Sequence, residues 1–362
     1  MIRLSSIIKK FESDFLSQYQ SQLLPSHRKA LRVMKICRTD QSPMMLTQCE
    51  ACEEQAYVPH SCGHRNCPHC QAHESQQWLE RQLEKQVPGD YFLLTFTLPA
   101  QFRSRAWAHQ RIIYKRMIQC CWETLKEFSH NDKKLQGIPG AVAVLHTHAR
   151  NLSYHPHVHI VMPAMAIDKK KRLCRTKQSD TGKPFLFDHK ALAIVFRAKF
   201  LEAIKQEGLT LPPKYPKEWV VHCKAVGTGE KALTYLGRYL YRGVIQEKDI
   251  IRCKEGNVTY RYQDSKTKKS VYKTVTGAKF LRLILQHILP KHFRRARNFG
   301  FLHPNSKRLI QVIQLVFKLD LKKALAYLKM RPVMICRCCG GVLQIMHTRV
   351  IRAENSPTWA PT

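Results

Sequence analysis

The chain has 362 residues, which is enough for two or three domains with hydrophobic cores. It carries 61 lysine and arginine residues against 26 aspartate and glutamate residues, so its formal net charge is +35 at pH 7. The cations are spread along the chain and 44% of the residues are hydrophobic, which excludes a disordered basic arm. A polyanion, first of all a nucleic acid, is the expected partner.

Membranes and disulfide scaffolds are not expected. The sequence has no apolar run of about eighteen residues, and its start, "MIRLSSIIKKFESDF", lacks the apolar core of a signal peptide. The chain is long and several of its fourteen cysteines stand in CxxC spacing, which indicates reduced thiols and zinc. We therefore expect a soluble, cytoplasmic protein that binds no membrane.

The first cysteine-rich segment, residues 49–70, reads "CEACEEQAYVPHSCGHRNCPHC". It holds two CxxC pairs with the spacing of two knuckles that close one structural zinc site. The four predicted ligands are Cys49, Cys52, Cys67 and Cys70. Cys62 and His64 lie between the pairs and either replace a ligand or, with neighbouring histidines, complete a second site. Arg65 and a basic helix after the segment would hold DNA by its phosphates.

A second cysteine-rich stretch, "CRCCGG", occupies residues 336–341. Cys336 and Cys339 form one knuckle, and no second knuckle follows it. Two interpretations remain open: half of a zinc site, completed by His347 or Cys338, or a remnant.

The segment between the cysteine clusters mixes strands and helices. "YFLLTFTLP" (91–99) and "AVAVLHTHA" (141–149) are predicted strands, and 105–128 is a predicted helix with an apolar stripe at helical spacing. A basic loop at 167–184 and a helix at 189–206 follow. The helical stripe is expected to be core, without a chemical role.

The stretch "NLSYHPHVHIVMP" (151–163) places histidines at alternate positions. In a strand, His157 and His159 share one face and the apolar residues share the other. The short turn "RNLS" predicts an antiparallel hairpin with strand 141–149, so His146 or His148 can reach the same metal ion. Three imidazoles would leave coordination positions open for substrate oxygens.

Residues 227–244, "GTGEKALTYLGRYLYRGV", predict a helix that opens after a glycine-rich turn. Tyr235 and Tyr239 stand one turn apart on the same face, and Arg242 lies one turn further on. A phenol needs a cationic neighbour or a base to attack at neutral pH. Paired tyrosines beside a histidine metal site in a basic protein indicate phosphodiester cleavage by a tyrosine nucleophile.

Through these motifs, the sequence resembles the rolling-circle transposases of the IS-ninety-one group, which belong to the HUH endonucleases of the two-tyrosine type. The resemblance runs through "SCGHRNCPHC", "FTLP", "LHTHARNLSYHPHVHIVMP", "YLGRYLYRGVI" and "QHILPKHFRRARNFGFL". It implies His157 and His159 as the metal pair, His146 rather than His148 as the third ligand, and Tyr235 and Tyr239 as nucleophile positions. Tyr239 is favoured as primary, because in this superfamily the nucleophile usually stands three residues before a basic side chain, here Arg242.

The resemblance also implies the fold and the reaction. The expected fold class is α+β, an antiparallel HUH core with flanking helices behind a small zinc-binding domain. The expected domains are 1–88 (helical and zinc-binding), 89–304 (catalytic) and 305–362 (helical tail with the knuckle). The reaction would nick and transfer single-stranded DNA at the hairpin ends of a mobile element, join it to target DNA, and proceed through a 5′-phosphotyrosine. Mg²⁺ or Mn²⁺ would serve the site, Zn²⁺ would be structural, and the protein would be associated with a bacterial nucleoid.

Three alternatives stay open. One is a replication initiator or relaxase with the same core, which the zinc segment and the "HILPKHF" region disfavour. Another is a non-enzymatic zinc-containing DNA-binding protein, which would bind DNA but form no covalent adduct. The least favoured is a tyrosine recombinase, because that chemistry needs no metal.

Overall fold

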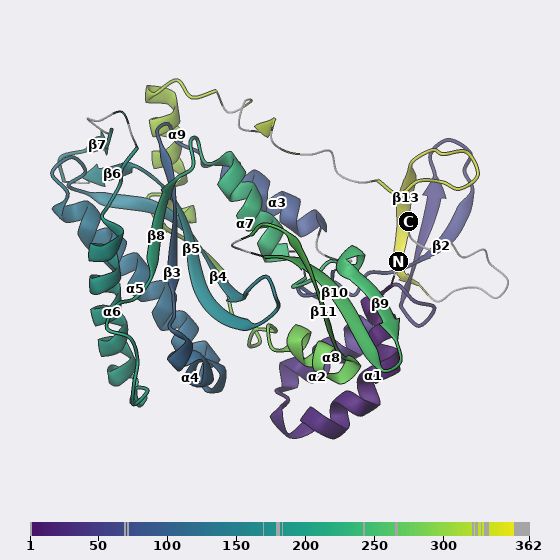
Figure 1. Cartoon of the computed structure of the whole chain (residues 1–362). Coiled ribbons are helices and arrows are strands. Elements are labelled where there is room, and N and C mark those ends of the chain that lie inside the picture. Colours follow the sequence, from purple (N-terminus) through teal and green to yellow (C-terminus); the bar gives the residue numbers. More distant parts are fainter. Residues whose placement is uncertain are drawn as a thin grey trace.

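The structure is a computed structural model of the whole chain. It describes residues 2–350, apart from 69, 71, 169, 179–181, 183, 242, 265–266, 321, 323–324, 327 and 329–332. The fold is α+β and its sheets are antiparallel, as the sequence predicts. Figure 1 shows a large sheet flanked by helices and, away from it, a small three-stranded sheet.

The large sheet forms the centre of the described chain. Its strand order is β7-β6-β4-β5-β3-β8, and β12 pairs with β4 beside β6. The strands are β3 (Tyr91–Thr97), β4 (Ile138–His148), β5 (Tyr154–Pro163), β6 (Met165–Asp168), β7 (Leu173–Thr176), β8 (Val221–Ala225) and β12 (Ala296–Gly300). Because side chains alternate along each strand, the sheet presents two different faces to its helices.

One face is covered by α4 (Arg103–Ala108), α5 (Gln110–Asn131) and α6 (His189–Gln206). The predicted helix 105–128 is therefore two helices, separated at His109. Its stripe is core as predicted: Met117 and Leu125 are fully buried in the main hydrophobic cluster.

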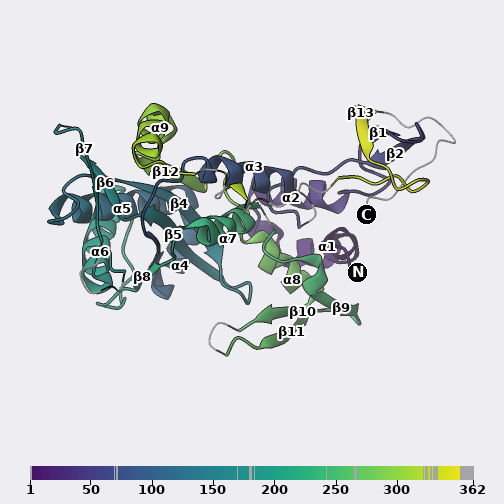
Figure 2. The same cartoon turned by 90° about the horizontal axis from the view of Figure 1, so that it is seen from above.

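The opposite face packs against α3 (Ala72–Leu83) and α7 (Glu230–Tyr241), and α9 (Lys307–Val316) joins the same hydrophobic cluster. Val142, Val144 and Val161 supply the sheet side of this core. Figure 2 shows α7 running between α3 and the large sheet.

A second unit combines the start of the chain with a later segment. The helices are α1 (Leu4–Tyr19), α2 (Pro25–Lys35) and α8 (Gly277–Leu285), and the strands are β9 (Ile250–Lys254), β10 (Asn257–Gln263) and β11 (Ser270–Thr276). Leu152, at the tip of the β4–β5 hairpin, is buried in the same core. The tip is therefore held by this second unit.

The third sheet joins the C-terminal end of the described chain to the hairpin that follows α2. β1 (Met44–Cys49) pairs with β2 (Gln55–Pro59) on one side and with β13 (Leu343–Val350) on the other. The yellow β13 lies against the purple hairpin in Figure 1. The segment after residue 305, expected as a helical tail, thus contains α9 and then a strand that extends an N-terminal sheet. None of the described helices combines the length and apolarity needed to span a bilayer.

Candidate metal and tyrosine site

The β4–β5 hairpin brings three histidines together. His146 on β4 lies directly opposite His157 on β5, and His159 follows two positions later on the same face. The ligand-capable nitrogens of the three rings lie within 4.8 Å of one another. An Asx-type turn in which Asn151 Oδ1 accepts the Ser153 amide hydrogen bond (3.0 Å) closes the hairpin.

The hydrogen bonds of these rings suit metal ligation. His159 Nδ1 lies 2.9 Å from Thr95 Oγ1, and His157 Nδ1 lies 2.7 Å from the His155 carbonyl oxygen. Such contacts fix a ring and leave Nε2 for a metal. His146 is fully buried, and neither of its nitrogens has a hydrogen-bond partner in the structure. A buried imidazole without partners is costly, and a bound cation would satisfy one of its two nitrogens.

Burial also keeps these imidazoles neutral. It lowers the pKa of His157 to about 4 and that of His159 to about 3, and it lowers the pKa of His146 well below its usual range. A neutral ring retains the lone pair that binds a metal. The residues present therefore fit a divalent cation at neutral pH.

The remaining histidines of the hairpin lie outside this cluster. A register irregularity follows His146, and the His148 ring packs against Tyr239 and His287, at centroid distances of 4.6 and 5.1 Å. His155 Nδ1 contacts Arg103 at 2.8 Å. Of the two candidates for third ligand, the structure brings His146 to the other histidines.

The tyrosine helix α7 is held against the histidine face of the sheet by its own apolar side and by α3. Its buried side carries Leu233, Leu236 and Leu240. A side chain at Gly237 would meet the Trp78 ring of α3 at 3.2 Å, so glycine permits the close approach of the two helices. Tyr235 and Tyr239 lie one turn apart on α7, next to this apolar stripe, and contact the histidines of β4 and β5.

The two tyrosines are placed differently. Tyr239 stacks on His146 with ring centroids 3.6 Å apart, and its hydroxyl donates to the His148 carbonyl at 3.0 Å. The Tyr235 ring lies 5.9 Å from that of His159 and is 44% exposed. Tyr235 is therefore the more accessible phenol.

Burial raises the pKa of both phenols, and arginines oppose the rise. The pKa of Tyr235 is raised by burial and lowered by nearby Arg150. For Tyr239, burial and Tyr235 raise the pKa, whereas Arg295 and Arg150 lower it. Arg242, the predicted activating cation, lies outside the described residues. Arg150 is a cation that the sequence analysis missed, because it reaches the site from the hairpin turn.

A groove of about 290 Å³ leads to the tyrosines. It runs between α7 and the β9–β11 sheet, and Arg150, Arg238, Arg261, Tyr260 and Tyr262 contribute to its walls. The sequence analysis assigned nothing to residues 250–276, although alternating tyrosines and cations there were a readable signal.

The cysteines form two clusters rather than the predicted single site. The first combines Cys37, Cys62, Cys67 and Cys70. Its Sγ–Sγ distances include 3.5 Å for Cys37–Cys70 and 3.7 Å for Cys62–Cys70. A tetrahedral zinc with four sulfur ligands separates its sulfurs by about 3.8 Å. The geometry therefore fits zinc, with Cys62 among the ligands and His64 outside the cluster.

The second cluster combines Cys49, Cys52, Cys336 and Cys339. Cys49 Sγ lies 3.5 Å from that of Cys339, and Cys52 Sγ lies 3.7 Å from that of Cys336. The prediction that Cys49 and Cys52 share a site with Cys67 and Cys70 is wrong, because strand β13 brings the C-terminal knuckle to β1. Neither Cys338 nor His347 completes the knuckle.

Comparisons with known proteins match two parts of the chain to transposase families. Residues 7–98 match the family model "Transposase zinc-binding domain", and residues 140–309 match the model "Putative transposase". The first match contains the Cys37 cluster and the second contains all three histidines and both tyrosines.

Two relatives extend the match over most of the chain. "Putative transposase y4qJ" of Sinorhizobium fredii is 29% identical over 82% of this chain and 79% of its own. "Transposase for insertion sequence element IS801" of Pseudomonas savastanoi pv. phaseolicola is 26% identical over 70% of this chain and 64% of its own. The solved conjugative relaxase TrwC, in complex with mutant OriT DNA, is 14% identical over 63% of this chain and 74% of its own, with a TM-score of 0.28.

The fold, the cysteine clusters and the sequence matches together define a transposase, an enzyme that acts on DNA. Within that class, the chain belongs to the IS91-type transposases with an N-terminal zinc-binding domain.

Proposed function

We propose that this transposase nicks and transfers single-stranded DNA by tyrosine attack at the ends of its mobile element. The observation that carries the proposal is the contact between two groups of side chains. Three buried histidines converge on one point of the sheet, and Tyr235 and Tyr239 pack directly over them from α7.

The chemistry follows from this arrangement. A phenolate oxygen attacks the scissile phosphorus, the P–O3′ bond breaks, and the phosphate stays joined to tyrosine as a 5′-phosphotyrosine. The leaving 3′ oxygen takes up a proton and becomes a free hydroxyl, while the phenol's proton passes to solvent. A divalent ion, Mg²⁺ or Mn²⁺, held by His146, His157 and His159 would polarise the phosphate oxygens. The covalent bond conserves the energy needed for rejoining to a target strand.

The geometry favours Tyr235 for the first attack. Its ring is partly exposed and stands beside His159, whereas the Tyr239 hydroxyl is engaged by a backbone carbonyl. The preference for Tyr239, taken from its spacing to Arg242, stays a prediction. Tyr239 would act second, once its hydrogen bond to the His148 carbonyl opens.

The groove beside α7 supplies a path for the single strand. Arg150 and Arg238 line it and would contact phosphates, and Tyr262 provides an aromatic ring near the bases. Stacking on aromatic rings suits unpaired bases, because paired bases are already stacked on each other.

The test is a denaturing gel of protein with labelled single-stranded hairpins drawn from the DNA that flanks its gene. With Mn²⁺ we expect a covalent band that EDTA abolishes, that Tyr235→Phe removes and that Tyr239→Phe retains for the first nick. Loss of the band in Tyr239→Phe alone would restore Tyr239 as the first nucleophile. If folded, zinc-loaded protein binds the DNA substrates but forms an adduct with none of them, the result would favour a non-enzymatic DNA-binding protein.

A further inference from the structure

A second groove lies beside β12, the strand that pairs with the start of β4. Its volume is about 1010 Å³, and its walls come from α3, the start of α5 and residues 292–304. Asn298 on β12 donates to Gln82 on α3 at 2.8 Å, which holds these elements together. Figure 2 shows β12 and α3 on the same side of the molecule, next to α9.

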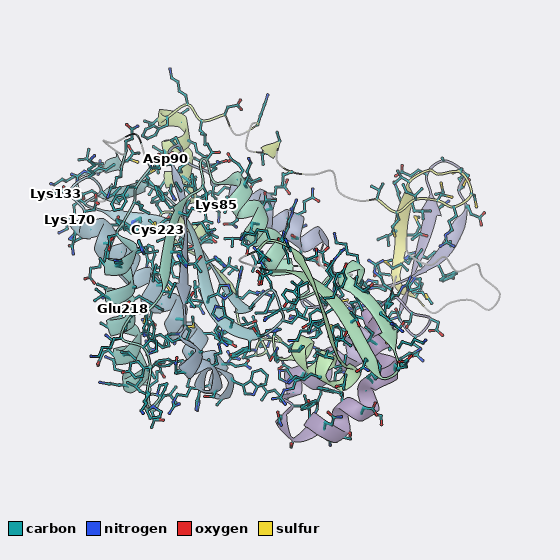
Figure 3. The ribbon with its side chains drawn as sticks, in the orientation of Figure 1. Lys85, Asp90, Lys133, Lys170, Glu218 and Cys223 are labelled. Carbon is teal, nitrogen blue, oxygen red and sulfur yellow. The ribbon has the colours of Figure 1, made fainter. Side chains whose placement is uncertain are left out.

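The lining of this groove is strongly cationic. Its arginines and lysines are Arg81, Lys85, Arg111, Lys115, Arg294 and Arg297. No carboxylate belongs to the described residues that line it. Lys85, labelled in Figure 3, follows the end of α3 and is one of the lining residues. Glu84, beside Lys85, offsets part of this charge. The six cations still repel one another, and an anion would relieve that repulsion.

Two of these side chains already show the repulsion. Burial, and then the neighbouring charge of Arg81, lowers the pKa of Lys85, and Glu84 opposes this shift only in part. Burial and Arg294 lower the pKa of Arg297 in the same way. Both cations would be stabilised by phosphate oxygens placed between them and their neighbours.

The aromatic rings of this groove are not available for stacking on bases. Trp78 is 6% exposed and Phe293 is 4% exposed. Phe299 stacks on Trp122 with ring centroids 5.0 Å apart and a 12° interplanar angle. The groove beside α7, in contrast, presents accessible tyrosines. Recognition in the cationic groove must therefore rely on phosphates, as for duplex DNA, rather than on unpaired bases.

We propose that the cationic groove binds the phosphate backbone of the duplex stem next to the single strand that the tyrosines cut. The inference rests on the proposed function for the identity of that single strand. One side chain links the two grooves: Arg295, between the groove residues Arg294 and Arg297, donates to the Tyr239 and Leu240 carbonyls at 3.4 Å each. A bound stem would thus lie beside β12, whose preceding residue, Arg295, contacts the end of the tyrosine helix.

The test measures binding rather than cleavage, so it stands even if the tyrosine chemistry fails. The probes are a hairpin duplex with a thymidine tail and the tail alone, titrated at several KCl concentrations. Phosphate contacts carry no sequence information, so an arbitrary duplex suffices. The test variant combines Arg81→Gln, Lys115→Gln and Arg294→Gln, three exposed side chains with no carboxylate partner among the described residues.

The control combines Lys133→Gln, Lys170→Gln and Lys190→Gln, which remove the same charge from exposed positions elsewhere. Figure 3 shows Lys133 and Lys170 at the outer end of the large sheet. We expect the groove variant to bind the tailed hairpin at least about tenfold more weakly, with the salt slope reduced by roughly 2 to 3. Its binding to the tail alone should match the control.

Two results would overturn the proposal. Equal hairpin affinity and salt slope for the groove and control variants would show that DNA does not use the groove. An equal loss on the hairpin and on the tail would show that the groove follows the single strand instead. Circular dichroism of both variants verifies that neither result reflects misfolding.

Discussion

The histidine cluster and the Cys37 cluster are both buried groups of metal-binding side chains, and they differ in what surrounds them. The Cys37 cluster supplies four sulfurs, which complete the coordination sphere of a tetrahedral zinc ion. The histidines supply three nitrogens, and the remaining side faces two tyrosines. A complete ligand set stabilises a fold, whereas an incomplete one leaves positions for a substrate.

The Cys37 cluster also supports the tyrosine helix. A side chain at Gly243, just beyond α7, would meet the Asn66 carbonyl at 2.6 Å, and Asn66 lies in the cysteine loop. Arg65 donates to the Phe293 carbonyl at 2.9 Å, and its predicted contact with DNA stays a prediction. Loss of this cluster should therefore affect both stability and catalysis.

The largest effect is expected for Cys67→Ser. Cys67 is buried, so the change removes a zinc ligand where solvent cannot replace it, and we expect a loss on the order of 5 kcal/mol of unfolding free energy. Thermal unfolding and zinc analysis measure this. DNA adduct formation should disappear as well. The matched change Cys120→Ser removes a buried thiol outside both clusters and should leave zinc content unchanged.

A smaller and more selective effect is expected for His157→Ala. The change removes one of three candidate ligands, so adduct formation should fall at least about 100-fold. Thermal stability and zinc content should stay near those of the wild type, because the cysteine clusters are untouched. His189→Ala, at an exposed position, is the control. Unfolding of His157→Ala would instead mark this cluster as structural.

The third effect concerns pH. Burial lowers the pKa of His27 to about 4, so the unfolded chain takes up a proton at this residue before the folded chain does. The contribution of His27 to the free energy of unfolding is thus fully present above pH 6.5 and is lost as the pH falls toward 4. We expect the free energy of unfolding to fall by about 2 kcal/mol through this residue when the pH is lowered from 7 to 5. His27→Leu should lack this component, and identical pH profiles for the two proteins would contradict it.

The smallest effect is expected for Cys339→Ser. Cys339 is exposed and its cluster packs against little apolar surface, with Leu343 the main buried neighbour. One zinc should be lost and the β13–β1 pairing weakened, while adduct formation stays within about threefold of the wild type. Loss of activity comparable to that of Cys67→Ser would show that the two cysteine clusters are equally important for the catalytic fold.

The sequence predicted the features that depend on local spacing. The alternation of His157 and His159 requires only that residues 151–163 form a strand, and the one-turn spacing of Tyr235 and Tyr239 requires only a helix. The α+β class was implied by the family resemblance of these motifs and is confirmed by the antiparallel sheets.

The zinc ligand sets could not be predicted in the same way, because they depend on distant pairing. Cys52 and Cys336 are 284 positions apart and meet only because β13 pairs with β1. Cys37 is a single cysteine at the end of α2, without a CxxC partner to mark it. The remaining signal was the isolated knuckle at Cys336 and Cys339, which needed a second pair and found it in Cys49 and Cys52.

The most direct measurement of the tyrosine mechanism is mass spectrometry of the covalent DNA adduct after trypsin digestion. Cleavage after Lys231, Arg238 and Arg242 places Tyr235 on peptide 232–238 and Tyr239 on peptide 239–242. We predict that the first nick leaves a nucleotide 5′-phosphate on peptide 232–238, only when a divalent metal is present. A nucleotide on neither peptide, from protein that has cut the DNA, would contradict the tyrosine mechanism.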